Sequence, residues 1–494
     1  MPVANSRRTW MTLLAALVIT RSAVFVFWPG SHFDSDQAVT GLMAKHLAQL
    51  RAFPVFWYGQ TYMLGVESWL AAPLMAVFGA SVTALKLPLL AMNVAIAWML
   101  FVGFTRDTEL DARWAAFATL FFVLASPVTS AHFLTANGGN VEPAFYILLL
   151  WFLRRRPIAM GLVLGVGFLN REFTIYGAVA LVLLDTLDGS LFTREAAARY
   201  AKAFGAAAAV WVVISGLRHF SSAAGPGTRM ADLSTQLAAN NLLQIAERLC
   251  FDLRAIASGA GRIFTVHWPE LFGLERQPLT DFGIESTTTQ GLRGGAWLLL
   301  PAIGIPVARM TLARSSRSAR GTSTFCVYLV LVAGISIVGY LVGRCGVIDF
   351  YTMRYELLSV LGACGLAGWY SGREQSAVLR AVWGTSCALI FAISIWSHTR
   401  LVAEYVMRPP VPAKQDLIAA LEARHVRYAY ADYWTAYYVT FMTRERIVVA
   451  STDVVKVRTH NREVDAHRGE AIRIARRPCD GGEQLTPAFW ACWY

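Results

Sequence analysis

Two carboxylates stand where the first apolar run of this chain ends. The run stops at Trp28, and Asp34 and Asp36 follow within the segment SHFDSDQAVTGLMAKHL. A carboxylate held next to a substrate hydroxyl can remove its proton as a general base. The alternative for Asp36 is a helix N-cap, a role that Ser35 could share. Because two acids lie together at the end of an apolar run, we interpret them as part of a site.

Cations and further polar residues occur far from the two acids along the chain. Arg354 stands at the mouth of an apolar run, where its guanidinium could hold a phosphate through two parallel hydrogen bonds. Lys86 and Arg171 are also candidate phosphate ligands, although Arg171 could instead pair with Glu172. Each candidate has a structural alternative, which is a plain turn, an ion pair or an anchor at a membrane interface. The remaining candidate substrate-binding residues are Gln60, Tyr62, Glu67, Asn137, Glu142 and Tyr351.

The segment after Asp36 predicts a helix that lies along a membrane surface. Its apolar side chains recur every three or four residues and therefore share one helix face, with Lys45 and Gln49 off that face. The helix dipole favours an ionised carboxylate near the N-terminus. In the preceding apolar run, Arg21 is either a functional intramembrane charge or a side chain that reaches toward the headgroups. The apolar face consists of Val39, Leu42, Met43, His46, Leu47 and Leu50.

The composition indicates a protein that crosses a membrane many times. Of its 494 residues, 56% are hydrophobic and only 15% are charged, and the mean hydropathy is +0.45. Many apolar runs approach the roughly 20 residues that a membrane-spanning helix needs. The formal charge of +12 is interpreted as an excess of Lys and Arg in cytoplasmic loops rather than as a nucleic-acid surface. We expect membrane lipids as partners, and no nucleic acid.

The charge pattern also predicts the topology. If the ambiguous run 62–78 lies on the outer surface, the Lys and Arg clusters all fall on the inner side. This gives eleven spans, a cytoplasmic N-terminus and an outer C-terminus. The expected spans are 10–28, 85–104, 113–127, 143–153, 158–170, 173–187, 203–217, 295–312, 325–343, 355–370 and 378–398. The expected outer regions are 29–84, 128–142, the long loop 218–294, 344–354 and a tail from 399.

The tail 399–494 is predicted to be a small α/β domain outside the cytoplasm, following a transmembrane domain at 1–398. KQDLIAALEARHV and YWTAYYVTFM have helical spacing, whereas VRYAYA and RIVVAS are typical of strands. An exported tail permits a disulfide between Cys479 and Cys492; two free thiols are the alternative. The aromatic residues Phe489, Trp490, Trp493 and Tyr494 are expected to pack on the core of the tail or on the membrane.

Common catalytic signatures do not occur in the sequence. It has no Walker loop, HExxH, GxSxG or Cys/His metal spacing. The residues indicate no cofactor, and they do not decide whether a divalent metal is required. A site on the outer side has no nucleotide sugar or ATP to use, so acids with phosphate-holding cations favour a substrate carried on a lipid phosphate.

The segments around the acids resemble the GT-C glycosyltransferases, especially the bacterial family that includes the lipid A aminoarabinose transferase and relatives of the protein O-mannosyltransferases. In that family the first outer loop opens with an acidic motif, usually Asp-Glu, where this chain has Asp36-Gln37. YGQTYMLGVESWLAAPLMAVFGAS is similar to the following Gly/Tyr segment and second interfacial helix. ALKLP and MRYELLSVLG are similar to later motifs. The resemblance covers residues 1–190 well and the rest loosely.

The resemblance implies an all-α polytopic membrane protein of GT-C type, with interfacial helices besides its spans. It implies transfer of a sugar from a polyprenyl-phosphate donor to a glycan, lipid or protein acceptor of the cell envelope, on the periplasmic side of a bacterial inner membrane. The transfer would be an inverting single displacement with Asp36 as base and Asp34 in support. The family's Glu is Gln37 here, and its Lys-Pro pair is absent. Phosphate binding then falls to Lys86, Arg171, Arg354 or another cation.

Two other classes of function are compatible with this composition. A transporter or flippase would bind a lipid-linked or anionic solute without chemistry, and it would place charges at mid-membrane, usually in repeated halves. No internal repeat occurs here. A structural partner of envelope machinery would use the tail as an interaction module. Sugar transfer by the purified protein would separate the transferase from both.

Overall fold

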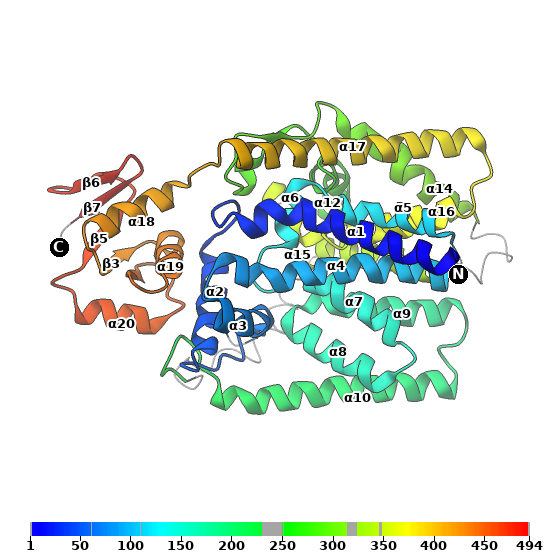
Figure 1. Ribbon diagram of the computed structural model, residues 1–494. Helices are drawn as coiled ribbons and strands as arrows, with labels where there is room; N and C mark the ends of the chain where they lie inside the picture. The colour runs from blue at the N-terminus through cyan, green and yellow to red at the C-terminus, as the bar shows by residue number, and fades with distance from the viewer. Residues whose placement is uncertain are drawn as a thin grey trace.

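The structure is a computed structural model that describes residues 2–60, 62–108, 110–229, 249, 251–313, 324–344 and 348–492. Its long helices run side by side in a bundle, and they lie across the picture in Figure 1. A small domain of C-terminal residues sits at one end of the bundle, and the N-terminus lies at the opposite end (Figure 1). The predicted combination of a polytopic helical part and a C-terminal α/β domain is confirmed.

Six segments of the described chain are long and apolar enough to cross a membrane, and each matches an expected span. Polar residues define where these helices begin. Ser81 and Thr193 accept hydrogen bonds from backbone N–H groups three residues later, which caps α4 and α10. The six segments are Arg7–Phe27 within α1 (Pro2–Phe27), α4 (Val82–Asp107), Arg194–Phe220 with α10 (Arg194–Leu217), Gly295–Leu312 with α14 (Ile305–Ala313), Thr324–Gly343 within α15 (Thr324–Arg344), and α17 (Ala377–Met407).

The other five expected spans are helical but short or broken. Expected span 113–127 is a pair of helices bent by 83°. Four others have 12 to 14 residues, which is about 18–21 Å at 1.5 Å per residue and less than the hydrocarbon thickness of about 30 Å. The count of eleven crossings therefore stays a prediction. These helices are α5 (Ala112–Val123), α6 (Pro127–Phe133), α7 (Glu142–Leu153), α8 (Pro157–Asn170), α9 (Ile175–Leu187) and α16 (Ser359–Ser371).

Shorter elements connect and cap the bundle. Part of the expected outer loop 218–294 is described, and its residues 230–248 and 250 lie outside the described residues. Strands β1 and β2 form a small antiparallel pair in this loop. The connecting elements are η1 (Glu172–Thr174), η2 (Arg218–Phe220), α12 (Leu253–Arg262), η4 (Ile263–His267), α13 (Trp268–Leu271), β1 (Gln277–Pro278), η5 (Leu279–Phe282), β2 (Thr289–Gln290), η6 (Gly295–Leu298), η7 (Leu300–Gly304) and η9 (Phe350–Glu356).

Helices α2 (Ser35–Ala48) and α3 (Val66–Phe78) lie at the domain end of the bundle (Figure 1). The predicted helix after Asp36 is confirmed, but burial extends beyond its apolar face. Most of α2 is buried, and even Lys45 keeps only 7% of its surface exposed. The reason is that the C-terminal domain covers α2 on the side away from the bundle. The 13-residue α3 packs against α2 and α4, and its position on the outer surface stays a prediction.

The C-terminal domain is a five-stranded sheet with strand order β4-β3-β5-β7-β6 and helices on both faces. The first three strands are parallel, and β7 pairs antiparallel with β5 and β6. Alternate residues of β3 face opposite layers: Ala429 contacts α18 and α19, whereas Tyr430 packs on the side of α20. Both predicted helices and both predicted strands are confirmed. The elements are α18 (Ala413–Ala423), β3 (Tyr428–Ala431), α19 (Tyr433–Met442), β4 (Val448–Ser451), α20 (Arg458–Ala466), β5 (Ile472–Ala475), β6 (Glu483–Thr486) and β7 (Phe489–Cys492).

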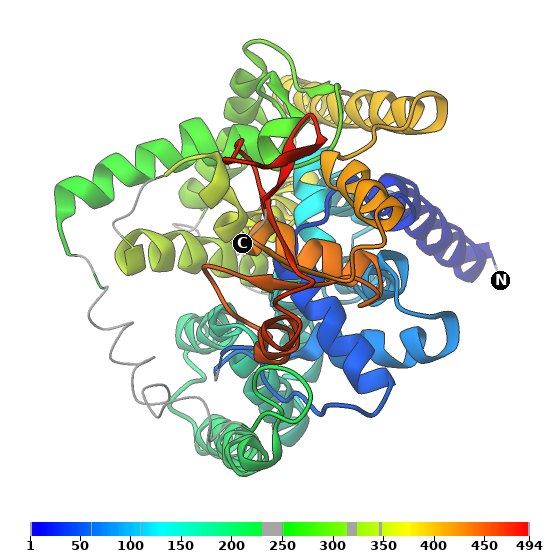
Figure 2. The ribbon, with the colours of Figure 1, turned by 90° about the vertical axis from the view of Figure 1, so that its left-hand side faces the viewer.

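The domain is seated on the bundle through α19, which packs against α2. Figure 2 looks onto this end of the molecule, with the domain in front. The ring of Phe441 lies so close to α2 that a Cβ on Gly41 would stand 2.4 Å from it. Phe33 packs on both Tyr438 and Phe441, with ring centroids 5.7 and 5.5 Å apart. Glycine at position 41 therefore permits the close approach of the two helices.

A short segment joins the bundle to the domain. Helix α17 continues to Met407, beyond the expected end of its span at residue 398, and α18 begins at Ala413. The intervening residues 408–412 include Pro409, Pro410 and Pro412. Proline fixes φ and stiffens a connection of this kind.

Arg21 is buried inside the bundle, with 4% of its surface exposed. It donates hydrogen bonds of 2.7 Å to the carbonyl of Phe122 and to the side chain of Asn93, and its guanidinium stacks on the Phe122 ring. Snorkelling to the headgroups is therefore wrong for this side chain. Arg21 ties α1 to α4 and α5, and it does not line the cavity described below.

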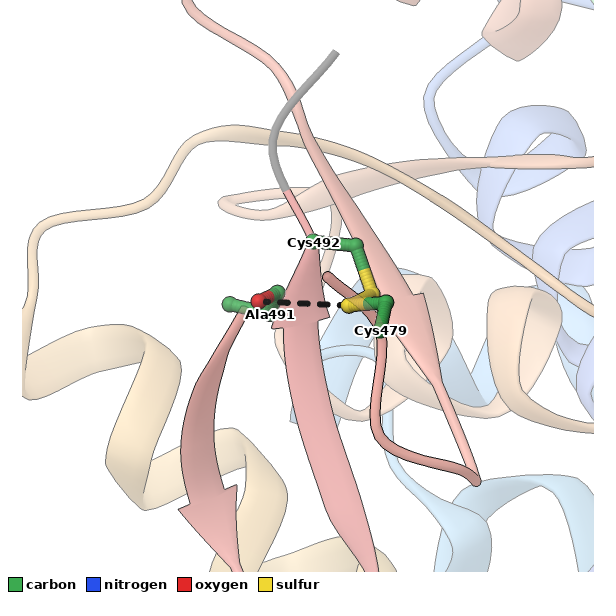
Figure 3. Close-up of a disulfide and its surroundings, with 3 residues drawn as sticks. All are labelled: Cys479, Ala491 and Cys492. Atoms are coloured by element: carbon green, nitrogen blue, oxygen red, sulfur yellow. Dashed lines mark hydrogen bonds between the residues drawn. A yellow bond between two sulfur atoms is a disulfide. The ribbon is translucent and has the colours of Figure 1, made fainter. Parts of the chain in front are cut away.

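The predicted disulfide between Cys479 and Cys492 is present (Figure 3). It ties the segment before β6 to the end of β7, and the Cys479 sulfur lies 3.9 Å from the carbonyl oxygen of Ala491. Of the expected aromatic cluster, Phe489 and Trp490 belong to β7, whereas Trp493 and Tyr494 lie outside the described residues.

Replacing Cys479 and Cys492 with Ser should lower the free energy of unfolding of the C-terminal domain by about 3 kcal/mol, because the disulfide restricts the unfolded chain. Hydrogen exchange in β5 and β7 of the full chain measures this change. Cys326→Ser, at a buried cysteine of the bundle, is the control and should leave exchange in these strands unaltered. Full alkylation of both thiols in unreduced protein would contradict the bond.

Candidate active site

A cavity of about 340 Å³ lies where the bundle meets the C-terminal domain. The bundle side of its lining contains six of the predicted site residues, although they are spread over more than 300 positions of sequence. The domain contributes the opposite side. The six predicted residues are Asp36, Gln60, Tyr62, Asn137, Arg171 and Arg354.

Asp36 stands in the first turn of α2 and faces the domain. The hydroxyl of Tyr433 donates a hydrogen bond to its Oδ1 atom. Burial and the nearby charge of Asp34 raise the pKa of the Asp36 carboxyl, whereas the Tyr433 hydrogen bond and the charges of Lys456 and Arg354 oppose this rise. The carboxyl is thus a stronger base than an exposed aspartate, and its ionised form is stabilised by its neighbours.

Two arginines face the same cavity without an acidic partner among the described residues. Arg354 lies over the ring of Tyr355 at 5.2 Å, and its Nε is buried with no hydrogen-bond acceptor. The guanidinium of Arg171 donates to the sulfur of Met63, at 3.5 Å, and among the described residues its Nε is also buried and unpaired. A buried donor without a partner costs free energy, so these two guanidinium groups are suited to bind an anion.

A third cation, Lys456, enters the cavity from the domain. Its ammonium lies 4.9 Å from the centre of the Trp57 ring. Burial lowers the pKa of Lys456, while the charge of Asp36 partly restores it. The second carboxylate of the lining, Asp453, already accepts hydrogen bonds from the backbone of Tyr433 and Val454. The cavity therefore combines one available base with three cations.

No protein-family model and no curated protein matches the sequence. Solved structures do match its fold. The oligosaccharyltransferase of Archaeoglobus fulgidus in its apo form aligns with 95% of this chain and 69% of its own, at a TM-score of 0.52 and 10% identity. The same organism's AglB, in complex with an inhibitory peptide and a dolichol-phosphate, aligns at a TM-score of 0.52 and 11% identity, with the same coverage of both chains. ArnT from Cupriavidus metallidurans, bound to undecaprenyl phosphate, covers 98% of both chains at a TM-score of 0.60 and 12% identity.

The chain has the GT-C fold. The predicted architecture, a polytopic GT-C membrane protein with a C-terminal domain, is confirmed at the level of the fold. At identities of 10–12% the similarity concerns the fold and assigns no role to individual residues of the site.

Four predicted site residues of this GT-C fold lie outside the cavity lining. Asp34, not Asp36, is the N-cap of α2, and its Oδ1 accepts a hydrogen bond from Gln37 N at 3.0 Å. Lys86 is fully buried and donates to the carbonyl of His32 at 2.5 Å. Tyr351 is 65% exposed to solvent, and its ring lies at a tilt against that of Phe350. Glu142 is completely buried at the start of α7.

Glu67 also lies behind the cavity wall, where it shapes a turn. Its Oε1 accepts hydrogen bonds from Gly138 N at 2.7 Å and Gly139 N at 3.1 Å. Both glycines have positive φ, and a Cβ on Gly139 would approach the Cβ of Arg171 to 2.9 Å. Glu67 thereby holds the turn that carries Asn137 into the cavity and leaves space for Arg171.

The domain residues of the lining were missed by sequence reasoning, although a signal for them exists. Tyr433 and Trp434 follow the carboxyl end of β3, whereas Asp453 and Lys456 follow that of the parallel strand β4. Ligands of parallel α/β sheets commonly bind beyond the carboxyl ends of the strands. Both strands were predicted, so the polar residues that follow them could have been proposed as site residues.

The described residues contain one group with ligand atoms spaced for a metal ion, and it lies outside the cavity. His46, Glu445 and His460 offer ligand atoms within 4.8 Å of one another. In the cavity itself, Asp36 is engaged by Tyr433 and faced by three cations. The question of a divalent metal in the reaction therefore stays open, and the one group spaced for an ion among the described residues lies away from Asp36.

Proposed function

We propose that this chain is an integral-membrane glycosyltransferase that moves a sugar from a polyprenyl-phosphate donor to a hydroxyl of a glycan, lipid or protein acceptor. The observation that carries the proposal is a base, Asp36, facing Arg171, Arg354 and Lys456 across one cavity. The lipid phosphates named with two structures of the same fold, dolichol-phosphate and undecaprenyl phosphate, support a donor of this class.

In the proposed reaction, the oxygen of an acceptor hydroxyl attacks the anomeric carbon of the donor sugar. Asp36 takes the proton of that hydroxyl as the new bond forms. The bond between the anomeric carbon and the phosphate oxygen breaks, and the electron pair leaves with the lipid phosphate. Attack opposite the leaving group inverts the configuration. The three cations stabilise the charge that develops on the phosphate, which is the electrostatic part of the rate enhancement.

The proposed location is a bacterial cytoplasmic membrane, with the cavity and the C-terminal domain on the periplasmic side. The domain and the chain's N-terminus lie at opposite ends of the bundle (Figure 1), which supports placing them on opposite sides. Purified protein in liposomes, given a radiolabelled polyprenyl-phosphate sugar and envelope acceptors, tests the function. Movement of label from donor to acceptor is expected. Transbilayer movement of an unchanged donor would favour the flippase instead.

Tyr433→Phe should move the acidic limb of the pH–rate profile to higher pH by about one unit. The tyrosine donates to ionised Asp36, so its loss raises the pKa of that carboxyl. Activity requires the ionised form, and it is therefore lost at a higher pH as the solution is acidified. One pKa unit corresponds to about 1.4 kcal/mol, which is typical of a hydrogen bond to a charged group.

The matched control is Tyr430→Phe, which removes a hydroxyl that donates to Asp465 elsewhere in the domain. Its pH–rate profile should coincide with that of the unmodified protein. A limb that stays in place in Tyr433→Phe would show that Tyr433 does not stabilise the catalytic charge.

A further inference from the structure

Glu445 of the C-terminal domain contacts four side chains, three of which lie in or just after α2. Its Oε2 accepts hydrogen bonds from Lys45 and from Arg51, the latter at 3.2 Å. Its Oε1 lies 2.9 Å from His46 Nε2 and 3.0 Å from His460 Nε2. Only 11% of the Glu445 side chain is exposed. Three of these partners, Lys45, His46 and Arg51, belong to α2 or follow it directly, so the carboxylate connects the domain to the bundle.

The backbone at this point adopts a conformation that side chains disfavour. Arg444 and Glu445 have φ values of 55° and 63°, in the left-handed region where a Cβ crowds the neighbouring carbonyl. The same turn directs the carbonyl of Arg444 toward Lys45 Nζ, at 2.8 Å. Such a conformation persists only where its surroundings hold it, and it is often found at functional positions.

The two contacts lie at opposite ends of a pair of packed helices. Tyr433, the first residue of α19, contacts Asp36 in the first turn of α2. Glu445 follows the end of α19 and contacts Lys45 near the end of α2. Asp36 and Lys45 are separated by about 14 Å along the helix axis at 1.5 Å per residue. The helices are thus fixed at both ends, with Gly41 and Phe441 packed between them.

We infer that Glu445 is a positioning residue, which locks the domain onto α2 so that Tyr433 and Lys456 face Asp36. The kinetic part of this inference rests on the proposed function, whereas the structural part does not. The ligand atoms of His46, Glu445 and His460 are also spaced for a metal ion. Lys45 and Arg51 already neutralise the carboxylate, however, and their charges oppose a third cation.

Hydrogen exchange of the full-length protein in nanodiscs tests the lock. Glu445→Gln keeps the shape of the side chain and removes its charge, and backbone exchange in α2 and α19 should become about tenfold faster. The matched control is Glu422→Gln, which removes a carboxylate of the same domain that pairs with Arg446. The control should leave backbone exchange in α2 and α19 unchanged. Unaltered exchange in Glu445→Gln would overturn the inference.

Lys45→Gln is a milder second variant if Glu445→Gln fails to fold. It leaves the carboxylate with Arg51 and the two histidines, so exchange in α19 should rise about threefold. No change in this variant would likewise overturn the lock. Elemental analysis of the unmodified protein adds a separate check: one tightly bound transition metal per chain, lost in Glu445→Gln, would replace the ion-pair lock with a metal site.

The pH–rate profile distinguishes positioning from general stabilisation. In a domain that is no longer seated, Tyr433 does not reach Asp36, so Tyr433→Phe should shift the acidic limb in the unmodified protein but leave it in place when Glu445→Gln is already present. An equal shift in both backgrounds would overturn the positioning role. Absence of sugar transfer by the unmodified protein would refute the proposed function, while the exchange experiment would still decide whether Glu445 locks the domain.

Discussion

Asp36→Asn should reduce turnover by about 10²–10⁴-fold, because in the proposed mechanism Asp36 takes the proton of the acceptor hydroxyl. The asparagine retains an oxygen that can accept the Tyr433 hydrogen bond, so the contact between α2 and the domain is preserved. Initial rates of sugar transfer by protein in liposomes measure the loss. Unchanged hydrogen exchange in α2 and α19 would show that the variant is folded.

Asp34→Asn is the matched variant two residues away. It removes the same charge, but asparagine is as good an N-cap as aspartate, so α2 should keep its start and turnover should stay within tenfold of normal. If Asp34→Asn lost activity and Asp36→Asn retained it, the base would be assigned to the wrong carboxylate. If both retained it, the proposed mechanism would be wrong.

Arg354→Met should lower kcat/KM for the lipid donor by about 10²–10³-fold. Removing one charged donor that faces developing negative charge typically has an effect of this size. Arg354 has no acidic partner among the residues described, so its loss leaves no unpaired carboxylate behind. Its charge also lowers the pKa of Asp36, and rates must therefore be compared on the high-pH plateau of each variant.

The control for this substitution is Arg293→Met, which removes an exposed arginine that does not line the cavity. It should leave both kcat and the donor KM unaltered. A loss below threefold in Arg354→Met would assign the phosphate to Arg171 and Lys456, and the double variant of those two residues would then carry the large effect.

The parts of the fold that could be predicted are those encoded by local periodicity. All eleven expected spans are largely helical, although 113–127 is a bent pair of helices. The tail elements follow from spacings of 3.6 and 2 residues, and the helix YWTAYYVTFM has the expected bounds, Tyr433–Met442. Periodicity does not determine whether a helix of 12 residues crosses the membrane, so the number of crossings could not be fixed in the same way.

Local sequence patterns do not predict the direction in which an individual side chain points. Lys86 heads a span as a phosphate ligand would, but it points to the carbonyl of His32. Glu67 and Glu142 are acids of the kind that bind a substrate, yet both are buried behind the cavity lining. Position in the sequence indicates how deep such a residue lies in the membrane, but it does not indicate the direction of the side chain.

The contribution of the C-terminal domain to the site could not be predicted from the sequence either. Tyr433 meets Asp36 across 397 residues of sequence, and the contact depends on how the domain docks. Docking in turn depends on single residues such as Gly41, which carry no recognisable signal in one sequence.

The short segment 408–412 between α17 and α18 limits how far the domain could move if it left α2. Three of its five residues are proline, and an extended proline-rich chain of this length spans about 16 Å. A released domain would remain at an effective concentration in the millimolar range relative to α2. A contact of α19 with α2 that would bind with a dissociation constant of about 0.1 mM between separate molecules would then stay closed roughly 90% of the time. A connection of this length therefore keeps a released domain within reach of α2, so that the cavity can form again by the same contact.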